Sequence, residues 1–297
     1  MSTSVKAAVR NLNPALYERA RRRVQRTSWA VPTRLGMQRM PPAFMLAGFV
    51  KAGTTTLFDR LAAHPDVLPP RHRLLHYFSY EYERGGKWYT EQFPAVARAR
   101  TQAVLRQRRP ITGEGSPSYA DHPLAPQRVH ADFPDVRLIF LLRNPIERAY
   151  SHYNMSRRDG EEPLETFEEA VDAEEGRLAG EFERVLEQPN YRAFNLSTYS
   201  YLTRGRYAEH VNRWLAVFPR EQVLLLTTEE LTQSWAETMG RCWGFLGLRD
   251  IDSGPVQRLN SASYSSMNPA TRERLREYFA PHNVETAKLL GRDPGWQ

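Results

Sequence analysis

The sequence has a single cysteine, Cys242, among its 297 residues. One thiol excludes an intramolecular disulfide and a cysteine-based zinc cluster. No apolar stretch reaches the length of a membrane span, and the N-terminus lacks the apolar core of a signal peptide. We therefore expect a cytoplasmic protein without integral membrane association. No acidic cluster has the pattern of a divalent-metal site, so we also expect no metal.

The charge balance is basic. Lys and Arg number 41 against 34 Asp and Glu, which gives a net charge of +7. This excess favours anionic ligands, but no recognition helix or aromatic–basic platform indicates nucleic acid, and we expect none to bind. The hydrophobic content of 41% is ordinary for a globular protein. Composition leaves the oligomeric state open.

We expect two parts in the chain: a basic appendage at 1–40 and one large domain at 41–297. Pro41-Pro42 marks the boundary between them. A run of arginines in the appendage is read as a solvated helix face or a basic leader, with a membrane-surface or nucleic-acid contact as the alternative. These arginines are Arg19, Arg21, Arg22, Arg23 and Arg26.

Apolar strand patterns alternate with helix patterns along the domain. Strands are expected at 43–49, 136–142 and 223–226, with a short strand end at 111–115; helices are expected at 54–63 and 207–218, with two more between 268 and 290. The run VRLIFLL at 136–142 is typical of a parallel strand buried on both faces. The pattern predicts an α/β fold, a single domain with a central parallel sheet flanked by helices.

The most informative segment is FMLAGFVKAGTTTL at 44–57. It reads as a strand, a tight turn and a helix N-terminus, which together present backbone N–H groups and a positive helix dipole to an anion. Gly48 and Gly53 have the spacing of the triphosphate-binding loop, but Thr54 stands where that loop has its lysine, and the lysine is at Lys51 instead. We expect a P-loop-like site for a shorter phosphate-type group. The alternative is a lysine in an ordinary strand–helix turn.

A second anion site is expected at the end of the strand at 136–142. Arg143 follows this strand, where ligands bind in open α/β sheets, and Ser151 lies eight residues later on the next helix. A guanidinium and a hydroxyl suit a phosphate. The alternative is a structural ion pair of Arg143 with Glu147. Two such sites in one domain predict a ligand with phosphates at separated positions.

The two segments KAGTTT (51–56) and LLRNPIERAYSHY (141–153) resemble the donor-binding motifs of sulfotransferases that use 3′-phosphoadenylyl sulfate. The resemblance extends to HYFS (76–79), GEGSPSY (113–119), LTRGRYAEHVNRWLAVFP (202–219), LREYFAPHN (275–283) and LLGRDPGW (289–296). It covers roughly 41–297 and is most similar to the bacterial and heparan-sulfate-type branch.

This resemblance implies a role for each matching residue. Lys51 would contact the bridging oxygen and the sulfonate of the donor, and Arg143 and Ser151 would hold its 3′-phosphate. The 5′-phosphate would lie in the loop and first helical turn formed by Ala52, Gly53, Thr54, Thr55 and Thr56. The donor would be 3′-phosphoadenylyl sulfate (PAPS), the nucleotide product 3′,5′-ADP (PAP), and no metal is implied. Residues 258–264 take the place of a loop that closes over the nucleotide, and no contact is assigned to them.

The acceptor side departs from the family pattern. Leu74 stands where this branch often has a glutamate base. His76 titrates near neutral pH and is the first candidate base; the alternative is a structural histidine. Glu114 is the second candidate, with a structural carboxylate paired to an arginine as its alternative. Gly115 replaces a lysine found in some glycan-acting relatives, which suggests a different acceptor.

The leading interpretation is a sulfotransferase that moves a sulfuryl group from PAPS to a hydroxyl or amine of a small-molecule, glycan or natural-product acceptor. Two alternatives stay open: an atypical nucleotide-dependent kinase, which would require ATP and magnesium, and a catalytically degenerate nucleotide-binding module. The sequence does not identify the acceptor.

Overall fold

The computed structural model describes residues 38–106, 108–255 and 266–296. The basic run and the segment 258–264 lie outside these residues. The elements, in chain order, are β1 (Phe44–Gly48), α3 (Thr54–Ala63), η2 (Tyr82–Arg84), α4 (Gly85–Thr90), α5 (Val96–Arg106), β2 (Gly113–Glu114), η3 (Pro117–Tyr119), α6 (Ala125–Asp132), β3 (Arg137–Leu142), α7 (Pro145–Arg158), α8 (Phe167–Asp172), α9 (Glu174–Leu178), α10 (Glu181–Glu187), α11 (Phe194–Tyr199), η4 (Thr203–Gly205), α12 (Tyr207–Leu215), η5 (Arg220–Gln222), β4 (Val223–Thr227), α13 (Thr228–Gln233), α14 (Trp235–Leu246) and α15 (Pro269–Leu290).

The sheet of the described residues has four strands in the order β2-β1-β3-β4, and all neighbouring pairs are parallel. Phe44 pairs with Gly113 on one side and with Arg137 on the other. The chain therefore leaves β1 first toward β2 and later reaches β3 on its opposite side. In sheets of this order, the crevice outside the carboxyl ends of β1 and β3 is the usual ligand site.

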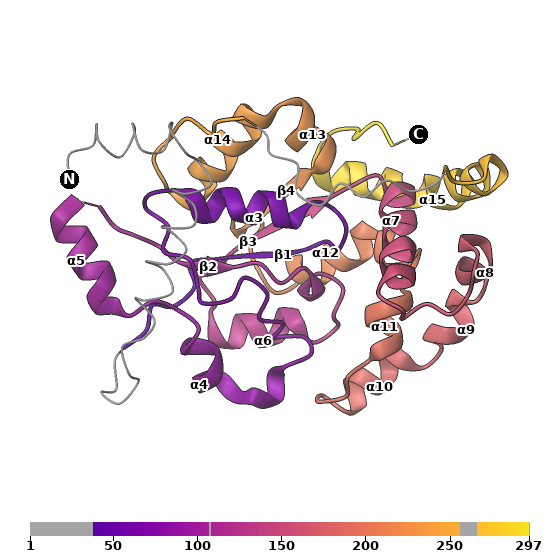
Figure 1. The fold of residues 1–297 in the computed structure, drawn as a ribbon, viewed down its shortest axis with the longest axis horizontal. Helices are drawn as coiled ribbons and strands as arrows, with labels where there is room; N and C mark the ends of the chain where they lie inside the picture. Colours follow the sequence, from indigo (N-terminus) through magenta and orange to yellow (C-terminus); the bar gives the residue numbers. More distant parts are fainter. Residues whose placement is uncertain (1–37, 107, 256–265, 297) are drawn as a thin grey trace.

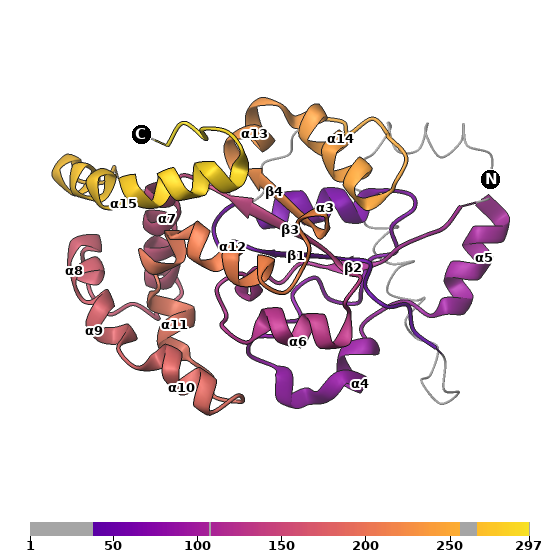
Figure 2. The same cartoon turned by 180° about the vertical axis from the view of Figure 1, so that it is seen from behind.

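Helices cover both faces of this sheet (Figures 1 and 2). Both views place α3, α13 and α14 on one side of the strands and α4 and α6 on the other. The two central strands are accordingly buried: every residue of β1 is buried, and β3 is buried after its first residue. Trp214 of α12 packs its ring against Phe140 of β3, with centroids 5.5 Å apart. The expected parallel sheet with flanking helices is thus confirmed.

Most local predictions agree with the structure. The helix expected at 54–63 is α3, and Asn144 caps α7 by accepting hydrogen bonds from the N–H groups of Ile146 and Glu147. The strand end at 111–115 is reduced to Gly113–Glu114, and the helix expected at 207–218 ends at Leu215.

The prediction of two helices between 268 and 290 is wrong. One helix, α15, runs from Pro269 to Leu290 with Pro281 in its interior. Proline removes one helical hydrogen bond and disfavours helix, but tertiary contacts can override this cost. Here Phe279 and Leu290, on either side of the proline, are both buried, so packing fixes both halves of the helix against the domain.

Candidate functional site

The loop between β1 and α3 has the backbone shape of an anion site. Lys51 and Gly53 both have positive φ, 68° and 89°. Alternation of left-handed and right-handed residues turns successive N–H groups toward one point. The first-turn N–H groups of a helix have no partner within the helix, and no side chain caps the N-terminus of α3. The loop and helix therefore present donors that suit an anion.

The remaining loop side chains are arranged around this turn. Thr54 and Ala52 are buried, whereas Lys51, Thr55 and Thr56 are only partly covered. A partly covered lysine can reach a ligand from the loop while its stem stays packed. The predicted residues of the first anion site thus lie together on one turn.

A residue that sequence analysis missed holds this loop in place. The Thr228 hydroxyl lies 2.7 Å from the Ala52 carbonyl oxygen and 2.9 Å from the Leu142 carbonyl oxygen, and it shares its single proton between the two. It thereby ties the anion loop to the end of β3. The signal in the sequence was its position two residues after the strand expected at 223–226, at the edge where ligands bind.

Arg143 joins the second motif to the first. Its Nη1 donates to the Lys51 carbonyl oxygen at 3.2 Å, so the two predicted anion sites are contiguous. The alternative ion pair with Glu147 is not formed, because the Glu147 carboxylate pairs with Arg272 at 2.7 Å. Ser151 lies on α7 and is buried.

The positive charges at this edge affect one another. The pKa of Lys51 is lowered, first by burial and then by the charges of Arg158 and Arg143, while Asp159 opposes the shift. Because Lys51, Arg143 and Arg158 repel one another, binding of an anionic ligand close to them is favoured. The electrostatics therefore agree with the loop geometry in favouring a phosphate-type ligand.

Glu114, at the end of β2, lies within a shell of hydroxyl groups. Its side chain is 0% exposed. One carboxylate oxygen accepts from Tyr119 at 2.6 Å and Tyr89 at 3.1 Å, and the other accepts from Ser116 at 2.5 Å. Burial raises the pKa of Glu114 to about 7, and these hydrogen bonds limit the rise. The partners are hydroxyls, so the alternative reading of Glu114 as a carboxylate paired to an arginine does not describe this site.

The same shell holds the backbone of His76. Ser116 Oγ accepts from the N–H groups of Leu75 and His76 at 2.9 and 3.0 Å while it donates to Glu114. His76 has φ of 52°, and burial is the main cause that lowers its pKa. Leu74, at the position of the expected glutamate, is 41% exposed.

The segment after Glu114 packs against the end of β1. The Ala120 N–H donates to the Ala47 carbonyl oxygen at 2.8 Å, and a Cβ on Gly48 would lie 2.2 Å from the Ala120 Cβ. The chain that carries His76 is therefore attached to the strand that leads into the Lys51 loop. Through these contacts the segment that follows β2 lies against the end of β1, and the Lys51 loop follows that strand.

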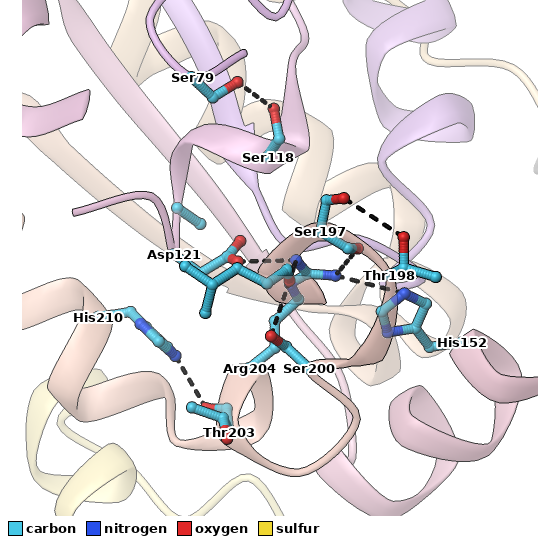
Figure 3. A network of polar contacts seen from close by, with 12 residues as sticks. Ser79, Ser118, Asp121, His152, Ser197, Thr198, Ser200, Thr203, Arg204 and His210 are labelled. Carbon is cyan, nitrogen blue, oxygen red and sulfur yellow. Dashed lines mark hydrogen bonds and ion pairs between the residues drawn. The ribbon is translucent and has the colours of Figure 1, made fainter. Parts of the chain in front are cut away.

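A buried polar network supports α7 behind this edge (Figure 3). Arg204 donates from Nη2 to Asp121 at 2.8 Å and lies 3.4 Å from His152 Nε2 through Nη1. Burial, followed by the charge of Arg204, holds the pKa of His152 well below its ordinary value, so the imidazole is neutral. His152 adjoins Ser151, and the network fixes this turn of the helix.

The described part of the chain holds no group of three or more His, Cys, Asp or Glu side chains that could bind a metal ion. Among the same residues, none of the helices combines the length and the hydrophobicity that a membrane crossing demands.

Comparison with known proteins decides the family. The model of the sulfotransferase domain family matches residues 41–286. This chain is a sulfotransferase. It is 30% identical to human heparan sulfate glucosamine 3-O-sulfotransferase 6, over 88% of this chain and 75% of that protein. It is 24% identical to the membrane-associated sulfotransferase kil1 of Dictyostelium discoideum, over 86% of this chain and 66% of that protein.

A solved structure agrees with the sequence relatives. The sulfotransferase from Alicyclobacillus acidocaldarius superposes with a TM-score of 0.61 and 31% identity, over 86% of this chain and 98% of that one. The expected fold class is confirmed, a single α/β domain with P-loop-like nucleotide-binding architecture. The expected activity is confirmed as well: this sulfotransferase transfers a sulfuryl group from PAPS to a glycan or small-molecule acceptor and releases PAP.

Proposed function

We propose that the Lys51 loop and the Arg143–Ser151 pair together hold the donor nucleotide across the carboxyl ends of β1 and β3. The observation that carries the proposal is the hydrogen bond from Arg143 to the Lys51 carbonyl oxygen, 3.2 Å long, which joins the two motifs. One ligand with two phosphate groups then contacts both. Gly53 and the three threonines receive the 5′-phosphate at the uncapped start of α3.

Each charged residue has a distinct task in this arrangement. PAPS supplies a sulfuryl group already bonded to a phosphate leaving group. Lys51 stabilises the negative charge that grows on the leaving oxygen, and the N–H groups of the first turn of α3 add to this effect. Arg143 and Ser151 fix the far end of the nucleotide, which positions the reacting end.

We assign the proton-accepting role to His76. The acceptor must lose a proton when its oxygen or nitrogen bonds to sulfur, and His76 is a half-buried histidine whose backbone is held by the segment that packs against the end of β1. Leu74 has no ionisable group, and Glu114 is surrounded by hydroxyl groups. Glu114 then acts through Ser116 by holding the His76 backbone.

The acceptor we propose is a hydroxyl or amine of a sugar, and one that differs from the acceptors of those relatives with a lysine at the position of Gly115. Support comes from the relatives, whose names specify O-sulfation of glucosamine in one case and N-sulfation of heparan sulfate in another. Incubation with sulfur-labelled PAPS and a panel of amino sugars and phenols tests this choice; label on phenols alone would contradict it.

The division into a basic appendage at 1–40 and a domain at 41–297 stays a prediction, as do a cytoplasmic location and the lack of nucleic-acid binding.

The donor site is tested by thermal shift with 3′,5′-ADP. A ligand that binds only the native state raises the melting temperature by mass action. We expect a rise with 3′,5′-ADP that is lost in Arg143→Ala. Arg137→Ala is the matched control, because Arg137 begins the same strand at its opposite end and is exposed. A rise only with ATP and magnesium would instead favour the kinase alternative, and an unchanged rise in Arg143→Ala would refute the assignment of Arg143.

A further inference from the structure

Three polar contacts connect the ring of His76, two serines and the backbone carbonyl oxygen of His76. His76 Nδ1 lies 2.7 Å from Ser118 Oγ. Ser118 Oγ lies 2.8 Å from Ser79 Oγ, a contact drawn in Figure 3. Ser79 Oγ lies 3.1 Å from the His76 carbonyl oxygen. Both serines are buried, Ser118 to 3% and Ser79 to 4% exposure, so water does not replace these partners.

Counting protons assigns a direction to each contact. A hydroxyl has one proton to donate, and a carbonyl oxygen only accepts. Ser79 donates to the His76 carbonyl oxygen, which also accepts from the N–H groups of Ser79, Tyr80 and Glu81, and it is then left as an acceptor toward Ser118. Ser118 must donate to Ser79 and can only accept from the ring. In this arrangement the ring nitrogen Nδ1 of His76 is the donor toward Ser118.

We propose that Ser118 is a positioning residue which, together with Ser79, holds His76 as the Nδ1–H tautomer and leaves the Nε2 lone pair to take the proton of the acceptor. This inference rests on the proposed role of His76 as base and adds the atom that acts. The hydrogen bond made by one ring nitrogen sets the protonation of the other. The Nδ1–H group is present in both the neutral and the charged ring. The hydrogen bonds from Nδ1 to Ser118 and from Ser118 to Ser79 therefore keep the same direction while Nε2 gains its proton.

The backbone under the ring is fixed by a separate set of contacts. Ser116 accepts from the N–H groups of Leu75 and His76, and its own proton goes to Glu114. The ring and its backbone are thus both held by hydroxyl groups of the segment 116–118. This explains how a residue with φ of 52° keeps one orientation.

The charged groups around His76 enter the expected pH profile. Glu81 raises its pKa, whereas Arg192 and Arg73 lower it, and burial exceeds each of these effects. The Tyr80 ring lies with its centroid 6.1 Å from that of His76. The net direction is downward, so turnover should fall on acidification at a lower pH than an unperturbed histidine would give.

The tautomer is measured directly by NMR of protein labelled with nitrogen-15 histidine. The chain has eight histidines, and the signals missing in His76→Gln assign those of His76. At pH 7.5 we expect a protonated Nδ1 and an unprotonated Nε2. In Ser118→Ala the ring loses its acceptor, and in Ser79→Ala the Ser118 proton becomes free to turn toward Nδ1. Both variants should gain the Nε2–H tautomer.

Turnover is measured in the same variants. A general base contributes ~10²–10⁴-fold, so within that limit kcat should fall in proportion to the active tautomer that the NMR spectra show to be lost, with little change in the KM for PAPS. Ser118→Thr keeps the hydroxyl and should restore both the tautomer and the rate. Ser197→Ala is the matched control, because that hydroxyl donates to the Phe194 carbonyl oxygen in α11. A retained thermal shift with 3′,5′-ADP shows that each variant is folded.

The outcomes separate the two levels of the proposal. An Nε2–H signal in the unmodified protein overturns the tautomer assignment, whatever the activity. An Nδ1–H signal together with full turnover in His76→Gln overturns the role of His76 as base while the tautomer stands. Loss of the Nδ1–H signal and of turnover in both serine variants, with recovery in Ser118→Thr, supports the inference.

Discussion

The buried carboxyl group of Glu114 gives a prediction about stability and pH. Its pKa is raised from 4.5 to about 7 in the folded protein. Between these two values the unfolded chain has released the proton and the native protein still binds it. Unfolding then releases a proton, so the free energy of unfolding falls as the pH rises. The stabilising contribution is complete below pH 4.5 and is lost as the pH passes about 7.

The size of the effect follows from the same two values. Each pH unit across the interval is worth about 1.4 kcal/mol, so the span from 4.5 to about 7 amounts to roughly 3 kcal/mol. Domains are stable by about 5–15 kcal/mol, so a change of this size is measurable. Glu114→Gln removes the titration and should abolish this part of the pH dependence. At low pH the variant should be less stable, because its amide NH₂ group replaces one acceptor in the hydroxyl shell.

Urea unfolding of the native protein and Glu114→Gln at intervals from pH 5 to 8 measures the difference directly. Other groups that titrate in this range are common to both proteins and cancel in the difference. Glu187→Gln, an exposed carboxylate on α10, is the matched control and should run parallel to the native protein. Parallel curves for Glu114→Gln as well would refute the reasoning, since they would show that Glu114 titrates alike in the folded and unfolded states.

Two further predictions concern the β1–α3 loop. Lys51→Ala should lower kcat by about 10²–10³-fold, the usual cost of losing one group that stabilises developing charge. Steady-state kinetics measure this loss, with Lys87→Ala, at an exposed lysine of α4, as the control variant. Turnover of Lys51→Ala close to that of the control would contradict the role of Lys51. Gly48→Ala should lower the urea midpoint, because its Cβ would lie 2.2 Å from the Ala120 Cβ and such overpacking costs ~1–3 kcal/mol or more. Gly240→Ala, in open space within α14, should be neutral or stabilising, and equal midpoints for the two variants would show that the contact at Gly48 relaxes without cost.

Local sequence patterns predicted the elements that position the site. The apolar run at 136–142 specifies a strand with both faces covered, and Asn144 with Pro145 specifies the helix start that follows it. These signals lie within a few residues of the structure they determine. The pattern failed where distant packing decides the outcome, as at Pro281, which lies inside one continuous helix.

The hydroxyl contacts of the site were not predictable in this way. Ser118 and His76 are 42 residues apart, and Thr228 and Ala52 are 176 apart. Serine and threonine are common on any surface. The sequence around Ser118 does not identify His76 as its partner, and the place of Thr228 after a strand does not identify Ala52. Only the fold brings them together, whereas Lys51 and Arg143 were found because each follows a recognisable strand.

The hydrogen bond that Thr228 shares between two carbonyl oxygens has a consequence for how the nucleotide binds. With Ala52 held to the end of β3 by this hydroxyl, the conformational entropy of the loop is lost when the chain folds rather than when the donor arrives. Donor affinity is then coupled to the stability of the corner between β4 and α13, a region with no assigned contact to the nucleotide. Selection for tight donor binding therefore acts on residues of that corner as well as on those that touch phosphate.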